Sequence, residues 1–127
     1  IPKDGPSGGV AIATALISLL SNVPVRHDMA MTGEITLRGE MLPVGGIRDK
    51  VLAAARRGYR AVVLPERNAE DVRRLPKSIH DEIEIHLMKS ADSAIELALS
   101  KPTPRRKLKA VPTAAKRAAK VARKPKR

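Results

Sequence analysis

Several residue types that shape most protein cores are missing or rare in this chain of 127 residues. It contains no cysteine, tryptophan or phenylalanine, and its single tyrosine is Tyr59. The lack of cysteine excludes disulfides and thiolate metal sites, and it fits a reducing compartment. Because aromatic residues are nearly absent, the core must be built from Ile, Leu, Val, Ala and Met.

Long apolar runs are also missing. The longest run, residues 10–20, includes Thr14 and Ser18 and is too short to span a bilayer. It does not have the flanking segments of a signal peptide, since no basic segment precedes it and no cleavage site follows it. We therefore expect no membrane association and a cytoplasmic location. Because the chain starts at Ile1, directly before a glycine-rich loop, we also expect it to be a fragment or a processed product.

Acidic residues are absent from the C-terminal end of the chain. Residues 101–127 hold 12 of the 25 Lys and Arg residues and no Asp or Glu, whereas residues 1–100 are neutral overall. This boundary predicts one folded domain, 1–100, followed by a disordered tail with too little apolar bulk to fold. The tail is either a solubilising extension or a DNA-binding segment that acts by counterion release.

The pattern of apolar residues within the first 100 positions predicts an α/β (α+β) fold. Residues 7–21 form an expected helix that is apolar nearly all round, which favours burial on most sides. The other expected elements are a hairpin at 29–37 and 41–44, helices at 47–57, 66–75 and 90–99, and strands at 60–65 and 82–89.

The first sequence feature with chemical potential is the loop KDGPSGG, residues 3–9, which precedes the apolar helix. Ser7 in this loop has three interpretations. It can cap the helix, as a serine before an apolar run usually does. The loop can bind a phosphate, although the pattern GxxxxGK[ST] is absent. Ser7 can also be a nucleophile, because a helix N-terminus offers amide donors and a positive dipole to an oxyanion.

A serine nucleophile needs a base, and the residues offer two kinds. His27, His80 and His86 lie in polar or charged surroundings, and we expect them to be surface residues, with His86 facing solvent from a strand. Lys50 lies at the edge of the apolar stripe of helix 47–57 and in its first turn, where the helix dipole disfavours a cation. From the helical pattern alone, Lys50 is equally well a charged lysine that reaches solvent.

Three long motifs resemble one known family. These are PKDGPSGG before the apolar helix, AMTGEITLRGEMLPVGGIRDKVLAA, and VVLPERNAEDV. Together they are similar to the peptidase domain of the Lon family of ATP-dependent proteases, and the resemblance extends over essentially all of residues 1–100. It implies a Lon-type peptidase fold, of which this chain is the C-terminal portion.

The resemblance also implies roles for individual residues. The serine of the DGPS motif, Ser7, would be the nucleophile of a Ser–Lys dyad, and Lys50 would be its general base. Thr32, from the TGEITLRG motif, would orient the lysine, and Asp4 would help to shape the site. One departure is Gly8, which stands where the family usually has alanine and gives the loop more backbone freedom.

The resemblance implies further parts that this chain does not contain. The family has a β-rich half of the peptidase domain upstream of the serine, and an ATPase module that would bind ATP and magnesium. No cofactor or metal is expected in the chain itself. The implied partners are unfolded protein substrates and five further subunits of a homo-hexamer. The alternative is a catalytically inactive fragment that acts as a structural or nucleic-acid-binding module through the tail.

Overall fold

The fold is built on a parallel β-sheet. A computed structural model describes residues 5–100 of the chain. Three strands, β1 (Met29–Met31), β4 (Ala61–Pro65) and β5 (Glu84–Met88), form this sheet in the order β1-β4-β5, with both pairs parallel. Each strand is reached through helical segments, as parallel connections require. The predicted α/β class is confirmed.

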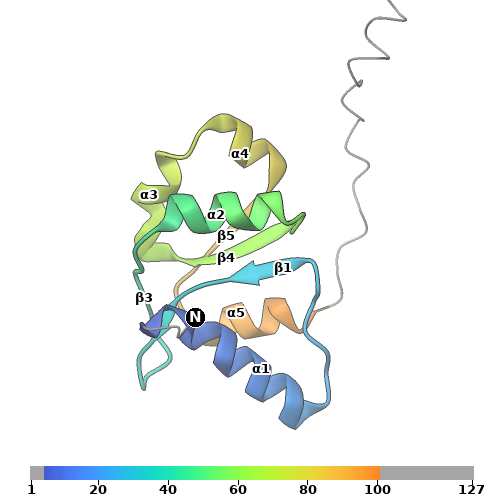
Figure 1. Cartoon of the computed structure of the whole chain (residues 1–127). Helices are drawn as coiled ribbons and strands as arrows, with labels where there is room; N and C mark the ends of the chain where they lie inside the picture. Colours follow the sequence, from blue (N-terminus) through green and yellow to red (C-terminus); the bar gives the residue numbers. More distant parts are fainter. Residues whose placement is uncertain (1–4, 101–127) are drawn as a thin grey trace, which may run out of the picture.

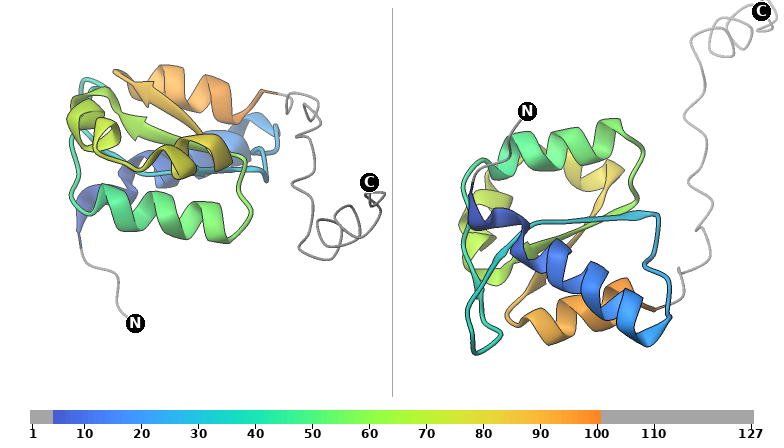
Figure 2. Two further views of the ribbon diagram at one scale, coloured as in Figure 1. Left: turned by 90° about the horizontal axis from the view of Figure 1, so that it is seen from above. Right: turned by 60° about the horizontal axis from the view of Figure 1, so that its bottom comes forward.

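Helices cover both faces of this sheet (Figure 1). One layer holds α2 (Ile47–Arg56), α3 (Ala69–Arg73) and α4 (Lys77–Glu82), and the other holds α1 (Gly9–Ser21) and α5 (Ala91–Ala98). The views in Figure 2 show the same two layers from above and from below. Two short 3-10 helices, η1 (Pro6–Gly8) and η2 (Glu66–Asn68), precede α1 and α3.

The central strand β4 divides the core into two clusters because its side chains alternate between the faces of the sheet. All five residues of β4 are buried. Val62 and Leu64 pack with α2, α3 and α4 in one cluster, and Ala61 and Val63 pack with α1 and α5 in the other. The apolar run 61–65, within the predicted strand 60–65, therefore reflects burial on both sides.

The predicted hairpin is smaller than the sequence suggests. Strand β2 (Glu34–Ile35) pairs antiparallel with β3 (Met41–Leu42), but Met29–Met31 belongs to the parallel sheet beside β4. The part of the prediction that joined 29–31 to the hairpin is wrong. Its partial alternation is typical of a hairpin arm, whereas β1 pairs with β4, Met29 opposite Ala61, and no local pattern reveals a partner so far along the chain.

Helix α1 follows the predicted helix closely, but the expected burial on most sides is wrong. Among its residues Val10 and Thr14 are buried, and they lie one turn apart on the face toward the sheet and α5. On the rest of the helix, Ile12 is 63% exposed, Leu16 55% and Leu20 82%. Within residues 5–100 no element covers these side chains, because the sheet and α5 contact one side of α1.

The structure also differs from the predicted elements at several places in residues 66–89. The expected helix 66–75 is divided into η2 and α3, and the segment around His80, where no helix is expected from the sequence, is helix α4. His86 is half-buried beside Glu84, while Leu87 is the more exposed residue, so the expected phase of this strand is wrong. Strand β5 lies at an edge of the sheet, where both of its faces are partly covered. Over residues 5–100 no helix combines the length and apolar character needed to cross a membrane.

Candidate active site

Ser7 lies in η1, immediately before the first turn of α1. Its side chain does not cap either helix: the N-cap residues are Gly5 for η1 and Gly8 for α1, and neither helix has a side-chain cap hydrogen bond. The capping interpretation of Ser7 is therefore wrong. The serine is half-buried, which leaves it partly open to solvent.

The backbone of Ser7 is fastened to the segment that follows β1. The Ser7 carbonyl oxygen accepts two hydrogen bonds, from the Gly33 N–H at 2.9 Å and from the Thr32 hydroxyl at 3.0 Å. One turn further on, the Val10 N–H donates to the Gly33 carbonyl at 3.0 Å. Because Thr32 N–H in turn donates to the Val63 carbonyl at 3.1 Å, the serine loop is tied directly to the central sheet.

Glycine at position 33 favours this close approach. A Cβ atom at position 33 would lie 2.6 Å from Met41 Cε and 3.5 Å from side-chain atoms of Val10 and Pro65. The absence of a side chain allows η1, β3 and the end of β4 to meet around one backbone segment. Sequence reasoning did not single out Gly33, although it lies inside the TGE motif; a glycine between two strands is a signal of close backbone approach.

Lys50 reaches the same place from another element. It lies in the first turn of α2, and its backbone N–H donates to the Gly46 carbonyl at 3.0 Å. The predicted helical face is confirmed: Ile47, Val51 and Ala54 are buried, and Lys50 is half-buried beside them. Its Nζ lies 3.5 Å from the Thr32 hydroxyl oxygen, which is long for a hydrogen bond.

The two helices that carry Ser7 and Lys50 begin on the same side of the sheet. In Figure 1, α1 and α2 both start at the side toward which β1 points, one in each layer. Thr32 follows the last residue of β1 and lies at this carboxyl edge, where α/β folds commonly hold their sites. The fold therefore brings together Ser7, Thr32 and Lys50, three of the four predicted site residues. The fourth, Asp4, lies outside the described residues.

The Thr32 hydroxyl occupies the centre of this arrangement. It has one proton, which it donates to the Ser7 carbonyl, so its lone pairs face the Lys50 amine. An N–H of Lys50 that points to Thr32 fixes the rotation of the Nζ group about its Cε–Nζ bond. Thr32 itself is 8% exposed, which limits competition from water for these contacts.

The histidines do not join this site. His27 is exposed; His80, also exposed, places Nε2 3.1 Å from the Val72 carbonyl; His86 forms a 3.2 Å contact with Glu84. Within residues 5–100, no group of three or more His, Asp or Glu side chains is arranged to hold a metal ion.

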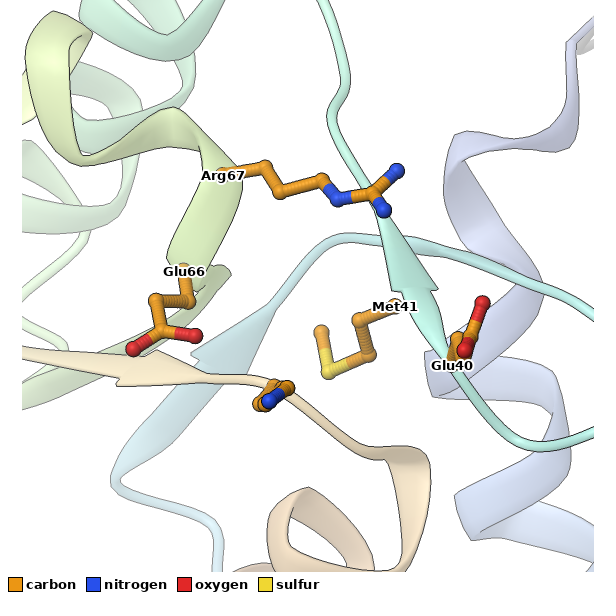
Figure 3. Close-up of a pocket in the computed structure, with 5 residues that line it drawn as sticks. Glu40, Met41, Glu66 and Arg67 are labelled. Carbon is orange, nitrogen blue, oxygen red and sulfur yellow. The ribbon is translucent and has the colours of Figure 1, made fainter.

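A small pocket opens beside the β2–β3 hairpin (Figure 3). Its volume is about 80 Å³, and it is lined by Glu40, Met41, Glu66, Arg67 and Lys89. The buried Met41 side chain lies between this pocket and Gly33. The lining does not include Ser7, Thr32 or Lys50, so the pocket and the predicted dyad are separate features of the same edge of the molecule.

Comparison with known proteins identifies the family. The family model described as the Lon protease (S16) C-terminal proteolytic domain matches residues 1–101. The chain belongs to the Lon protease C-terminal proteolytic domain family. Membership assigns it to the proteolytic domains and confirms the resemblance carried by the three motifs.

Individual Lon proteases support the same assignment. The chain is 50% identical to the Lon protease of Trichlorobacter lovleyi over 117 residues, which cover 91% of this chain and 14% of that protein. It is 54% identical to the Lon protease of Dictyoglomus thermophilum and 52% identical to Lon protease 2 of Thermus thermophilus, each over 99 residues. Those two alignments cover 78% of this chain and 12% of each relative. The chain thus spans about one eighth of the length of these Lon proteases.

Proposed function

We propose that this Lon-family domain is a serine endopeptidase in which Ser7 is the nucleophile and Lys50 is the general base. The observation that carries the proposal is the position of the Thr32 hydroxyl, which contacts both the Ser7 carbonyl and the Lys50 amine. It supports a dyad because a serine hydroxyl is inert until a base held nearby removes its proton. The alternative, an inactive remnant, gains no support from the family match.

In the first half of the proposed reaction, Ser7 Oγ attacks the carbonyl carbon of a substrate peptide bond. Neutral Lys50 accepts the hydroxyl proton as the new C–O bond forms. Backbone N–H groups and the dipole at the start of α1 favour the negative charge on the tetrahedral oxygen. The resulting ammonium of Lys50 then donates its proton to the leaving amine, the C–N bond breaks, and an acyl ester on Ser7 remains.

In the second half, water hydrolyses the ester. Neutral Lys50 accepts a proton from the attacking water, and its ammonium returns that proton to Ser7 Oγ as the C–O bond breaks. Thr32 takes no proton in this cycle. Its role in the proposal is to hold the direction of the Lys50 amine through both halves.

We further propose that the domain works within a larger, ATP-dependent assembly. The support is that its relatives, named Lon proteases, are much longer than this chain, whose alignments cover 14% and 12% of their length. ATP and magnesium would be bound by an ATPase module rather than by this chain, in which the P-loop pattern is absent. The proposed substrates are unfolded proteins, the proposed assembly is a homo-hexamer, and the proposed location is the cytoplasm. Asp4 stays a predicted supporting residue.

The dyad is tested by labelling with a serine-reactive fluorophosphonate. In the full-length product of the gene, we expect the wild type to be labelled at Ser7, S7A not to be labelled, and K50M to be labelled at least about 100-fold more slowly. The matched control is K77M, which removes an exposed lysine of α4 and should label like the wild type. Equal hydrolysis of an unfolded protein by K50M and the wild type would contradict the dyad.

A further inference from the structure

Asn68 is one of three buried polar residues in residues 5–100 and is 3% exposed. It stands at the N-cap position of α3, where an asparagine normally accepts a hydrogen bond from the start of its own helix. Here the side chain makes no such cap bond. A buried side-chain amide that does not cap its helix needs other hydrogen-bond partners, and the identity of those partners indicates its role.

The amide of Asn68 pairs with both backbone groups of one distant residue. Asn68 Oδ1 accepts from the Val44 N–H at 3.0 Å, and Asn68 Nδ2 donates to the Val44 carbonyl at 2.9 Å. The second hydrogen of Nδ2 goes to Asp71 Oδ2 at 2.8 Å. These three bonds use both donors of the amide, and Asp71 fixes which end is oxygen and which is nitrogen.

Val44 lies in the segment that leads into α2. It is followed by Gly45 and by Gly46, the N-cap of α2, whose φ of 68° is in the left-handed region. Two consecutive glycines give this connection wide conformational freedom. The pairing of Asn68 with Val44 restrains the segment from its N-terminal side, much as a neighbouring strand would.

Lys50 lies shortly after this restraint in the chain, in the first turn of α2. Ile47, Val51 and Ala54 pack one face of α2 into the apolar cluster, but Lys50 lies at the edge of that face and the helix is entered through the glycine pair. Lys50 is bonded through its N–H to Gly46, and its contact with Thr32 is already long at 3.5 Å. A small shift of the first turn would therefore move the amine out of reach of Thr32.

We propose that Asn68 is a positioning residue for catalysis, which holds Lys50 in place by clamping the Val44 backbone before α2. The inference rests on the proposed Ser7–Lys50 function and extends it to a residue that touches neither the substrate nor the reacting atoms. It also explains why an amide is buried here. An apolar side chain of the same size would fill the space but leave the Val44 N–H and carbonyl without these partners.

The test compares N68A with V72A in the full-length product of the gene. Val72 is buried in the same cluster as α2, so V72A loosens packing around the helix but keeps every hydrogen-bonding group of the Val44 clamp. For hydrolysis of a fluorogenic peptide, we expect N68A to lower kcat about 10- to 100-fold with KM within about 3-fold of wild type. V72A should keep kcat within about 3-fold when measured where both variants are folded.

A second variant keeps the test decisive if N68A does not fold. The double variant N68D/D71N exchanges the amide and the carboxylate, so that side-chain volume and the contact between positions 68 and 71 are retained. A carboxylate at position 68 still accepts from the Val44 N–H, but it cannot donate to the Val44 carbonyl. We expect kcat to fall at least about 3-fold with KM unchanged, since half of the clamp is lost.

Failure of this inference differs from failure of the dyad. If S7A and K50M are inactive while N68A and N68D/D71N keep the kcat of V72A, Asn68 is a structural residue and the inference is overturned. If S7A cleaves the peptide as fast as the wild type, the proposed function itself is wrong. A fall in kcat for N68A that V72A matches at equal stability would likewise assign Asn68 to folding alone.

Discussion

The side chain of Thr32 holds the backbone of Ser7: its hydroxyl donates to the Ser7 carbonyl at 3.0 Å, across 25 positions of the sequence. The same oxygen faces Lys50 Nζ at 3.5 Å. One hydroxyl thus connects the loop before α1 with the first turn of α2, and through β1 it connects both to the central sheet. This geometry makes Thr32 the most informative position at which to perturb the site without removing either proposed catalytic group.

Replacing Thr32 with valine should impair catalysis more than folding. T32V keeps the β-branched shape but removes both contacts of the hydroxyl. The Ser7 carbonyl retains its bond from Gly33 N–H, so we expect a loss of about 1 kcal/mol in the free energy of unfolding. The Lys50 amine loses its orienting partner, and kcat for peptide hydrolysis should fall about 10- to 100-fold.

The matched control for this prediction is T32S, which restores the hydroxyl in a slightly smaller side chain. Steady-state kinetics should place T32S much closer to the wild type than T32V. If the two variants lose the same fraction of kcat, the lost shape rather than the lost hydroxyl accounts for the effect.

The two adjacent glycines before α2 should respond differently to alanine. Gly46 has φ of 68°, where an added Cβ is strained, and its Cβ would also lie 4.0 Å from Lys50 Cε. Gly45 has ordinary φ and open space around it. We expect G46A to lower the free energy of unfolding by about 1 to 2 kcal/mol and to slow fluorophosphonate labelling of Ser7.

G45A is the internal control, because it changes the same loop by one methyl group without backbone strain. Its unfolding free energy should stay equal or rise by about 0.4 to 1 kcal/mol, since alanine restricts the unfolded chain. Urea denaturation of the two variants in parallel measures the difference. Equal stability of G45A and G46A would show that the left-handed conformation of Gly46 is not maintained in solution.

Much of this fold follows from local sequence patterns. The strand at 60–65, the helix at 47–57 with its glycine end, and the serine-capped helix before residue 99 have short-range signals, and each is found near its expected position. The cap is observed directly, since Ser90 Oγ accepts from Ser93 N–H at 3.3 Å. The half-buried place of Lys50 likewise follows from its angle on one helix.

What local patterns miss depends on contacts between distant segments. The pairing of Met29 with Ala61 and the clamp of Asn68 on Val44 both join elements far apart in the sequence. The exposed side of α1 is a different case, because its apolar composition predicted burial that the elements of residues 5–100 do not provide. The Ser7–Lys50 pair was suggested by the family motifs, and Thr32 shows how the fold connects them.

The ion pair of Arg26 and Asp28 should make stability depend on pH. Two bonds of 3.0 Å join the guanidinium to the carboxylate, and both side chains are at most 10% exposed. The hydrogen bond from Arg26 holds the pKa of Asp28 below its ordinary value. A carboxyl whose folded pKa is lowered stabilises the fold above its unfolded pKa, about 3.9, and loses that contribution as the pH falls through the folded pKa.

We therefore expect D28N to lower the free energy of unfolding of the 127-residue chain by about 2 kcal/mol at pH 7. The gap to the wild type should narrow as the pH is lowered from 5 toward 2, as Asp28 becomes protonated in the wild type too. Urea denaturation of both proteins between pH 5 and pH 2 measures this difference in unfolding free energy. E70Q is the control: it breaks the exposed pair Glu70–Arg73, at 2.9 Å, and should cost at most about 1 kcal/mol. A gap for D28N that does not change with pH would contradict the ionic origin of the effect.

Of the two roles predicted for residues 101–127, a solubilising extension or a DNA-binding segment, DNA binding through charge alone gives a direct test. Because residues 101–127 hold 12 Lys and Arg residues while residues 1–100 are neutral, the chain truncated after Ser100 should lose DNA binding. Each phosphate contact contributes about −0.9 to the slope of log K against log salt, so engagement of roughly half of these cations predicts a slope near −5. Fluorescence anisotropy with two duplexes of unrelated sequence should give the same slope for both, because no aromatic residue is present in the tail to stack on bases. Binding that persists after truncation, or that is insensitive to salt, would assign the tail a solubilising role instead.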